Sequence, residues 1–421
     1  MTSKRAPDEA YVWVWMPGAV EPVVAGVIRS RGTSFVFSYG KRYLARPDAI
    51  ALYTPELPLT PGVQDPQPGL NIFGCLADAG PDSWGKRVLL ARHYGKLDSG
   101  SDTGDLSPLH YFLESSSNRI GGLDFQASAT DYQPRLPKSQ ATVEDLALAS
   151  ERLLEGLTLH ADIDEPLTQG TAIGGARPKA IVLDAVRQRE VIAKFAVKTD
   201  VYPAIPAEAV AMELARRAGL NVAATSVMRA NGRYTLLVDR FDRTDAGGRR
   251  IMVSALTMLG LDEMIAVRGS SYVDLADIMR RDFVNGAQAT RELFRRIVFN
   301  IAVGNTDDHA RNHAAFWNGR ELELTPAYDI APQVRGGSES NQAMNIARGR
   351  DGDRRSRFST CIAAAGEYGL SPAEASSTVE EIKQVVVDEW DDAADAVELT
   401  ALDKQALWGR QILNPSIEWS D

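Results

Sequence analysis

The chain has 421 residues, of which 44% are hydrophobic and 24% charged, as expected for a globular protein long enough for two or three domains. Its net charge of -10 argues against bulk, nonspecific nucleic-acid binding, and its two cysteines lie too far apart for a disulfide scaffold or a metal-ligand spacing, which fits a cytoplasmic location. Neither a signal peptide nor an apolar run of the roughly 20 residues that span a bilayer is apparent, so no membrane association is expected.

Residues 1–130 are predicted to form a small β-rich unit. Val and aromatic residues gather there in short runs that Gly or Pro turns separate, a pattern typical of short strands. These runs cover residues 11–16, 23–30, 33–40 and the last part of 118–126.

Loop and helix signals fill the rest of this first unit. The stretch 51–71 is rich in proline and predicts a loop. Helical periodicity follows, with Asp82 or Ser83 as a possible N-cap, and a second short helix is predicted over 106–115. The polar stretch 127–142 contains prolines and is predicted to be the linker that ends this unit.

The second predicted unit covers residues 140–250. Its elements come in a definite order: an amphipathic helix, a glycine-rich loop leading into a strand, a strand with a lysine, a helix with a glutamate, and a third strand. They correspond to residues 143–157, 169–183, 189–197, 207–220 and 233–241.

The third predicted unit, residues 251–421, is mainly helical and includes a long helix over 371–390. Two polar segments interrupt it. They are "GNTDDHARNHAAF", residues 304–316, and "LTPAYDIAP", residues 324–332. Apolar runs flank the first segment on both sides, so core elements are expected to hold it in place.

The first of these segments offers Asp307 and Asn312. Phosphoryl transfer needs a carboxylate that orients or deprotonates the attacking hydroxyl group, and a hard oxygen ligand for a divalent metal nearby. The spacing of these two residues matches that of Asp and Asn in the protein-kinase catalytic loop. Asp and Asn are also common turn and cap residues, so the spacing alone leaves both interpretations open.

Two further features favour the kinase interpretation. Asp329 follows a short apolar strand that ends at Leu324, as the second metal-binding Asp of a kinase follows its catalytic loop; the alternative is a simple turn residue. Lys194 lies within an apolar strand pattern, where burial requires a partner, and Glu208 opens the following helix and could supply it. The alternative for Lys194 is an edge-strand lysine that reaches into water.

Other chemistries fit the sequence less well. His309 and His313 could share a helix face and, with Asp307, bind zinc, although no Glu lies between the two histidines to act as a base. The roles expected for them are instead a residue that supports the loop for His309 and a helix-start or solvent residue for His313. No G-x-S-x-G nucleophile motif occurs. The adjacent Asp307 and Asp308 usually would point in different directions, which makes them a poor acid and base pair for glycoside cleavage.

Several of these motifs, taken in order, resemble the HipA family of bacterial serine/threonine kinases, typically toxins of type II toxin–antitoxin pairs. The resemblance rests on "GGARPK", "IAKF", "AEAVAMELARRAGL", "LLVDRFDR", "GNTDDHARN" and "LTPAYDI", with "FGCLADAGPDSWGKRVL" and "NRIGGLDF" as looser matches in the first unit. It implies an α+β, two-lobed protein-kinase-like fold with a small N-terminal β-rich subdomain and a mostly helical C-terminal lobe.

The same resemblance implies roles for individual residues. Asp307 would be the catalytic base, and Asn312 and Asp329 would hold Mg²⁺. The nucleotide-binding residues implied for ATP are Lys194, Lys179, Glu208, the phosphate-contacting loop at Gly174, Gly175 and Ala176, and the hinge backbone at Asp239 and Phe241.

The chain departs from the family pattern at two positions. The serine that family members autophosphorylate aligns with Ala172, and the neighbouring Thr171 is the candidate to replace it. Arg311 stands where a lysine is common, which keeps the positive charge but changes its shape.

The function expected from the resemblance is an ATP- and Mg²⁺-dependent protein kinase whose target is a protein such as an aminoacyl-tRNA synthetase, so that translation is inhibited. A small helix-turn-helix antitoxin would be its partner and would make most of the DNA contacts. Two alternatives stay open: a catalytically silent corepressor or binding module, and a small-molecule kinase of the same fold.

Overall fold

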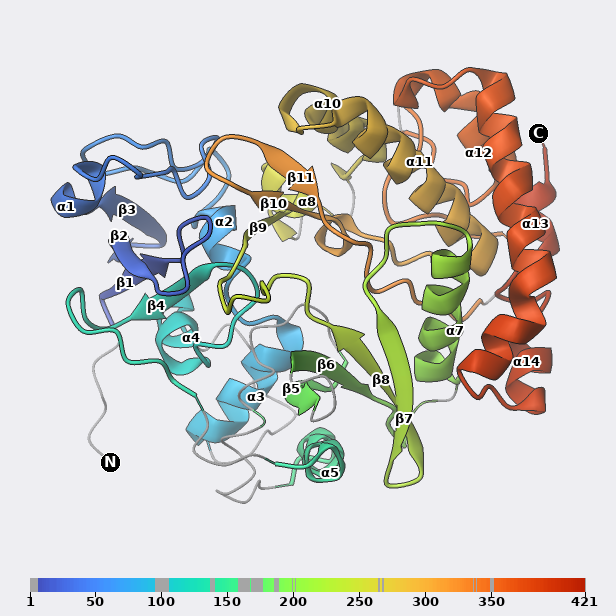
Figure 1. Ribbon diagram of the computed structural model, residues 1–421, viewed down its shortest axis with the longest axis horizontal. Coiled ribbons are helices and arrows are strands. Elements are labelled where there is room, and N and C mark those ends of the chain that lie inside the picture. Colours follow the sequence, from blue (N-terminus) through green and yellow to red (C-terminus); the bar gives the residue numbers. More distant parts are fainter. Residues whose placement is uncertain are drawn as a thin grey trace.

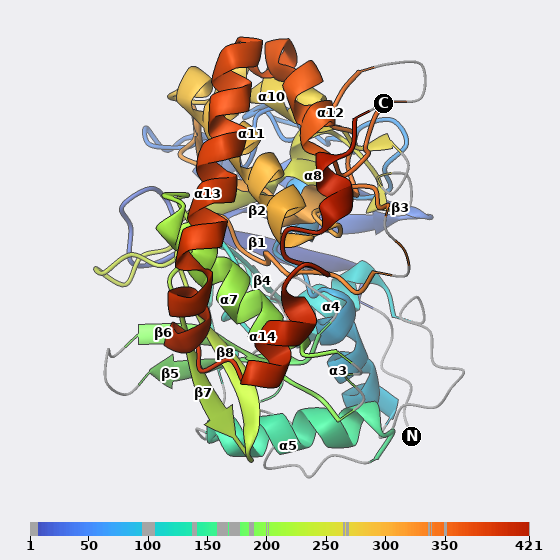
Figure 2. The same cartoon turned by 90° about the vertical axis from the view of Figure 1, so that its right-hand side faces the viewer.

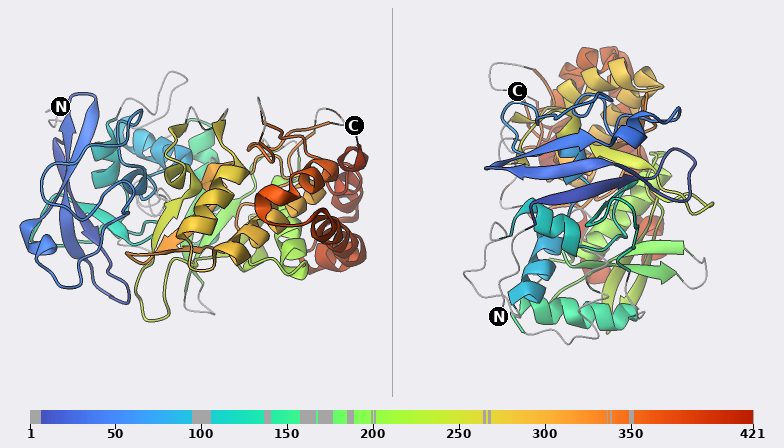
Figure 3. Two further views of the ribbon diagram at one scale, coloured as in Figure 1. Left: turned by 90° about the horizontal axis from the view of Figure 1, so that it is seen from above. Right: turned by 90° about the vertical axis from the view of Figure 1, so that its left-hand side faces the viewer.

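The computed structural model describes residues 7–420 except 95–105, 137–140, 158–166, 168–176, 185–188, 199, 201, 264–265, 267–268, 336, 338 and 349–351. The chain is elongated, with the N-terminal sheet at one end and the C-terminal helices at the other (Figures 1 and 3). Three antiparallel sheets follow one another between these ends.

The first sheet has the order β3-β2-β1-β4. The predicted strands are present here as β1 (Glu9–Val14), β2 (Val23–Arg31), β3 (Ser34–Tyr39) and β4 (Leu123–Gln126). The helices of this region are α1 (Lys41–Leu44), α2 (Gly74–Ala77), α3 (Ser83–Tyr94) and α4 (Pro108–Glu114). Asp82 is the N-cap of α3, because its Oδ1 accepts a hydrogen bond from the Gly85 amide at 2.7 Å, which confirms one of the two predicted caps.

The stretch predicted as a linker is irregular over its described parts, 127–136 and 141–142, but residues 127–136 are not detached from the sheet. Tyr132 packs on Trp13 and Trp15, with ring centroids 5.2 and 5.8 Å away. Arg135 donates to the carbonyl oxygen of Phe125 at 2.7 Å. These contacts hold the stretch against the edge of the first sheet.

The second sheet has the order β5-β6-β8-β7. Its strands are β5 (Lys179–Asp184), β6 (Arg189–Phe195), β7 (Thr225–Ala230) and β8 (Arg233–Asp239), and its helices are α5 (Val143–Leu154) and α7 (Ala204–Arg217). The prediction missed β7, although the Asn231-Gly232 pair between β7 and β8 is a common hairpin turn, and both residues have the positive φ values, 51° and 77°, that such turns use.

The third sheet, β11-β10-β9, joins strands far apart in the chain. Ser254 in β9 (Ile251–Ser254) pairs with Ala314 in β10 (Ala314–Trp317), and β11 (Leu322–Leu324) completes the sheet. The strand predicted to end at Leu324 is therefore present. The mainly helical pattern expected after residue 251 omitted β9 and β10, because their pairing is long-range and leaves little local signal.

Helices make up most of the remainder. They are α8 (Ala255–Met258), α10 (Tyr272–Asp282), α11 (Gly286–Val303), α12 (Phe358–Ala363), α13 (Pro372–Ala396) and α14 (Ala401–Leu407). Figure 2 shows the long α13 lying across α11 and α7, and α13 begins at Ser371 with a capping box. One continuous core runs from the first sheet through α7 to α13. Over the described part of the chain, no helix is long and apolar enough to cross a membrane.

Candidate active site

The polar loop begins where α11 ends and β10 starts. Gly304 closes α11 with φ of 70°, and a Cβ there would lie 2.6 Å from the Gln411 carbonyl oxygen, so glycine is required by both conformation and space. A short 3-10 turn, Ala310–Asn312, then leads into β10. A buried helix and a buried strand therefore fix both ends of the loop.

Within the loop, the two adjacent aspartates have opposite surroundings. Asp307 is exposed, whereas Asp308 is 4% exposed. Asn312 is also buried, and its Nδ2 donates to the Asp307 carbonyl oxygen at 3.3 Å. The loop therefore presents the Asp307 carboxylate outward and holds the backbone of that residue from behind.

Asp308 is the internal support of the loop. The Tyr272 hydroxyl donates to Asp308 Oδ2 at 2.7 Å, and His313 Nε2 lies 2.9 Å from the same oxygen. His313 was predicted to be a helix-start or solvent residue, and that prediction is wrong: His313 is 3% exposed and contacts Asp308. The reason is that residue 313 lies at the start of a buried strand, not on a helix.

Lys194 lies at the centre of the second charged group. Its Nζ donates to Glu208 Oε1 at 2.5 Å and also to Asp329 Oδ1. The predicted pairing with Glu208 is therefore present, and the alternative of a lysine pointing into water is excluded, since Lys194 is 9% exposed. Glu208 lies one turn inside α7, which begins at Ala204, and does not open the helix as predicted.

Asp329 has the backbone conformation of a strained position. Its φ is 59°, in the left-handed region that non-glycine residues other than Asn and Asp rarely adopt. This conformation turns its carboxylate to Lys194, and so joins the segment after β11 to the second sheet. The polar segment 324–332 is therefore part of the same cluster as β6 and α7.

The charges in this cluster are unequal, because Lys194 pairs with Glu208 and Asp329, while Asp307 has the Asp329 charge as a neighbour. Although the Asp307 side chain is exposed, the surrounding protein partly desolvates its carboxylate and raises its pKa, and the nearby Asp329 charge adds to the effect. Burial likewise raises the pKa of Glu208. Burial alone would raise the pKa of Asp329 and lower that of Lys194, but their mutual attraction outweighs it, lowering the pKa of Asp329 and raising that of Lys194.

Lys179 lies beside Lys194 because the two residues pair directly across β5 and β6. It is 1% exposed, and its Nζ donates to Asp82 Oδ2 at 2.6 Å. Burial lowers the pKa of Lys179 and raises that of Asp82. Sequence reasoning identified Asp82 only as a helix cap; the second use of its carboxylate required the tertiary fold.

The two predicted hinge residues lie at and just beyond the end of β8. The Asp239 amide donates to the Ala224 carbonyl oxygen at 2.8 Å. Phe241 packs between Phe316 of β10 and Tyr328, with ring centroids 6.0 and 5.7 Å away. The hinge segment therefore touches β10, which follows the polar loop, and the polar segment 324–332.

Some of the predicted residues cannot be placed. Gly174, Gly175 and Ala176 of the glycine loop, and Thr171 and Ala172 before it, lie outside the described residues. Their assignments stay predictions.

The zinc alternative is not supported by the described residues, which contain no group of three His, Cys, Asp or Glu side chains placed to hold a metal. His313 is directed to Asp308, and the two histidines flank a 3-10 turn and do not share a helix face.

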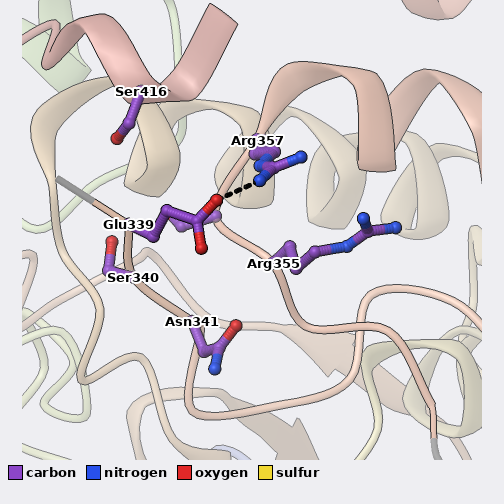
Figure 4. Close-up of a pocket in the computed structure, with 7 residues that line it drawn as sticks. Glu339, Ser340, Asn341, Arg355, Arg357 and Ser416 are labelled. Atoms are coloured by element: carbon purple, nitrogen blue, oxygen red, sulfur yellow. Dashed lines mark hydrogen bonds and ion pairs between the residues drawn. The ribbon is translucent and has the colours of Figure 1, made fainter. Parts of the chain in front are cut away.

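A polar pocket of about 100 Å³ is lined by none of the predicted site residues. Glu339 pairs there with Arg357 (Figure 4), and Arg355 pairs with Asp353 at 2.7 Å. Since both arginines have a carboxylate partner, this pocket has little positive charge to offer a nucleotide phosphate. The candidate active site is therefore the cluster around Lys194 and the polar loop.

Comparisons with known proteins agree with this location. Residues 171–390 match the family model of the HipA-like C-terminal domain, which includes every residue of the cluster. The putative kinase Y4mE of Sinorhizobium fredii is 32% identical over 134 residues, which is 30% of this chain and 32% of that protein. The serine/threonine-protein kinase toxin HipA of Shewanella oneidensis is 29% identical over 143 residues, 29% of this chain and 33% of that protein. The matches thus span about a third of the length of these curated relatives.

A solved structure matches over nearly the whole length. It is HipA of the Shewanella oneidensis MR-1 toxin–antitoxin system, described as a complex of HipA, HipB and operator DNA. The TM-score is 0.63 at 19% identity, with 98% of this chain and 100% of that chain covered. At this identity the match shows the fold, a two-lobed kinase-like architecture, and confirms the predicted fold class.

Proposed function

The chain belongs to the HipA-like family, and on that premise we propose that it is an ATP- and Mg²⁺-dependent serine/threonine protein kinase, the toxin of a toxin–antitoxin pair. The observation that carries the proposal is the double ion pair of Lys194 with Glu208 and Asp329, next to the polar loop. A lysine held by a helix glutamate, beside a carboxylate that follows the catalytic loop, is the arrangement with which kinases hold nucleotide phosphates.

The described residues supply the remaining parts of a phosphoryl-transfer site. The exposed Asp307 carboxylate would accept the proton of the attacking hydroxyl group, and its raised pKa suits a base. Lys194 and Lys179, which point from neighbouring strands, would hold the phosphates, together with Gly174, Gly175 and Ala176. The backbone of Asp239 and Phe241 would receive the adenine.

The residues present also fit a magnesium ion. Asn312 and Asp329 offer the oxygen donors that Mg²⁺ prefers, and the cluster carries more negative than positive charge. Mg²⁺ is usually bound by one or two protein carboxylates plus substrate phosphates and not by a dedicated all-protein cage. When bound, it would neutralise the charge that develops on the phosphates.

The proposed protein partner is a small helix-turn-helix antitoxin, as HipB is for the similar HipA structure. The net charge of -10 supports a division of labour in which the antitoxin makes most of the DNA contacts. A protein target such as an aminoacyl-tRNA synthetase is proposed on the family resemblance alone. Retention of the lysine, the base and both metal ligands supports catalysis over a binding-only role.

Intact-protein mass after incubation with ATP and Mg²⁺ tests the proposal, with Asp307→Asn as the matched control. We expect the wild type to gain one phosphate and to phosphorylate a protein in a lysate of the host from which the chain comes. The Asp307→Asn control should do neither. Peptide mapping would then show whether Thr171 carries the phosphate in place of the serine that Ala172 replaces. A wild type that binds ATP but transfers phosphate to neither itself nor any lysate protein would contradict kinase activity.

A further inference from the structure

A short segment of the first unit, Asp78–Trp84, lies between the two sheets that carry the candidate site. It joins α2, which lies beside β9, to α3, whose first turn lies beside the start of β5. Each end of the segment places a largely buried carboxylate, 11% exposed at Asp78 and 12% at Asp82, against a different sheet. We call this segment the brace.

Asp78 fixes the end that faces β9 and the polar loop. Its Oδ2 accepts hydrogen bonds from the Ser254 amide at 2.7 Å and from Thr257 Oγ1 at 2.8 Å, and its Oδ1 accepts one from Ser254 Oγ at 2.7 Å. Arg311 of the loop lies 3.9 Å from the same carboxylate. The Ala255 amide, next to Ser254, donates to the His313 carbonyl oxygen at 2.7 Å, so Asp78 and the loop meet at one corner.

Asp82 fixes the end that faces β5. One carboxylate oxygen caps α3, and the other accepts from Lys179 Nζ at 2.6 Å. The Trp84 indole donates to the Lys179 carbonyl oxygen at 3.1 Å, so both the side chain and the backbone of Lys179 are held. Lys179 lies directly opposite Lys194 in the sheet.

The segment between the two carboxylates is stiff. Gly80 donates its amide to the Ala77 carbonyl oxygen at 2.8 Å, and a Cβ at Gly80 would lie 2.9 Å from the Phe112 ring. Pro81, which follows, is buried and has a fixed φ. A stiff connection transmits a displacement from one end to the other, whereas a flexible one would absorb it.

Removing two carboxylates from most of their solvent is costly unless they are well paired, and this desolvation raises the pKa of both Asp78 and Asp82. Neither aspartate belongs to the loop or to the Lys194 cluster. Their hydrogen bonds go instead to Lys179 on one sheet and to the corner that supports the loop on the other.

We infer that Asp78–Trp84 is a brace between the lobe that contains the second sheet and the lobe that contains β9 and the polar loop. Asp82 positions Lys179 in the first of these lobes, and Asp78 positions the corner beside Arg311 in the other. The N-terminal unit therefore sets the separation of the two lobes. Both aspartates are positioning residues, since each acts through another residue. The effect on phosphate transfer rests on the proposed function, but the mechanical coupling does not.

Amide hydrogen exchange of the full chain without nucleotide tests the coupling independently of catalysis. Asp78→Asn is expected to raise exchange in β5 (Lys179–Asp184), at the far end, and Asp82→Asn to raise exchange in α8 (Ala255–Met258), each by roughly tenfold. Glu56→Gln is the matched control, because Glu56 is a buried carboxylate of the same unit that accepts hydrogen bonds from the Gly74 and Cys75 amides. The inference would be overturned if the increase in exchange were confined to the end of the brace that carries the substitution. It would also be overturned if Glu56→Gln raised exchange at both ends equally.

Kinetics give the second test. Each single Asn variant should lower kcat/KM for ATP by roughly tenfold, and the double variant should lose no more than the worse single one, because releasing either end releases the brace. Additive losses would instead mean two local effects and would overturn it. If the wild type transferred no phosphate, the proposed function would be rejected. The hydrogen-exchange result alone would then test the brace.

Milder variants cover the case in which an Asn variant does not fold. Thr257→Val removes one hydrogen bond to Asp78, and Trp84→Phe removes one hydrogen bond to Lys179. For these variants, too, amide exchange should rise at the end of the brace that does not carry the substitution, by about threefold to tenfold. The kcat/KM for ATP should fall by about threefold to tenfold, and the losses should again not add in the double variant. A change limited to the end that carries the substitution would again contradict the brace.

Discussion

Two groups of charges in this molecule differ in how fully their carboxylates are paired with cations. The first, the seam, lies between the first sheet and the hinge and consists of Arg119, Asp124, Arg240, Asp242 and Arg243. The second, the Lys194 cluster, consists of Lys194, Glu208, Asp307 and Asp329. Both carboxylates of the seam pair with arginines, whereas the Lys194 cluster holds three carboxylates and one lysine.

The pKa shifts follow this difference. Burial by itself would raise the pKa of Asp124, but Arg119 and Arg135 outweigh it and lower the pKa to about 2. Arg240 and Arg243 likewise lower the pKa of Asp242. In the Lys194 cluster the pKa values of Asp307 and Glu208 are raised. A group whose carboxylates all pair with guanidinium groups stabilises the fold, whereas a group with an excess of carboxylates retains affinity for cations, which is the feature expected of a functional site.

The largest expected effect is on catalysis. Asp307→Asn should lower phosphate transfer by about 10²–10⁴-fold, because the amide cannot accept the proton. The free energy of unfolding should not fall, since the change removes a carboxylate that the Asp329 charge opposes. Single-turnover phosphate transfer and denaturant unfolding measure the two quantities. A marked loss of stability with phosphate transfer retained would mean that Asp307 stabilises the fold and does not act as the base.

The next effect falls on the seam. Asp242 accepts hydrogen bonds from the Gly121 amide at 2.8 Å and from Arg240 and Arg243 at 2.7 Å each. Asp242→Asn leaves two buried guanidinium groups without that charge, and should cost about 3–5 kcal/mol of unfolding free energy. Urea denaturation checks this, and Asp48→Asn, which removes an exposed ion pair with Arg46, is the control expected to change little.

A smaller loss is expected from Glu208→Gln. Lys194 keeps Asp329 as a partner, so the lysine stays charged, but it is held from one side only. The kcat/KM for ATP should fall by roughly tenfold, as for loss of a hydrogen bond to a charged group. If steady-state kinetics show the same kcat/KM as the wild type, the double pairing of Lys194 does not position it for phosphate.

The smallest difference is one of pH. Because the pKa of Asp307 is raised above its ordinary 3.8, the acid limb of kcat/KM should lie above pH 3.8. Asp124 has a lowered pKa, so its contribution to stability is fully present above pH 3.8 and is lost as the pH falls toward about 2. Activity should therefore disappear before the stability that depends on the seam. Parallel pH profiles of transfer and of far-UV circular dichroism would detect the opposite order.

The sequence identified the polar loop, Lys194, Glu208 and Asp329 because phosphoryl transfer restricts the residue types and their order in the chain. Helices such as α3 and α13 were also predictable, because a cap and a 3.6-residue periodicity are local signals. The strands β9 and β10 were not, since their pairing joins residues far apart in the chain and depends on contacts that no short window contains.

The supporting residues were likewise decided only by the tertiary structure. His313 was assigned to a helix start or to solvent, yet its place at the beginning of a buried strand turns it to Asp308. Asp82 was recognised as a cap, but its second oxygen meets Lys179 only because α3 packs beside β5. Local sequence thus determined which residues are candidates for the chemistry, while long-range packing determined which charged and polar groups hold them in place, because a side chain acquires its partners only when distant segments meet.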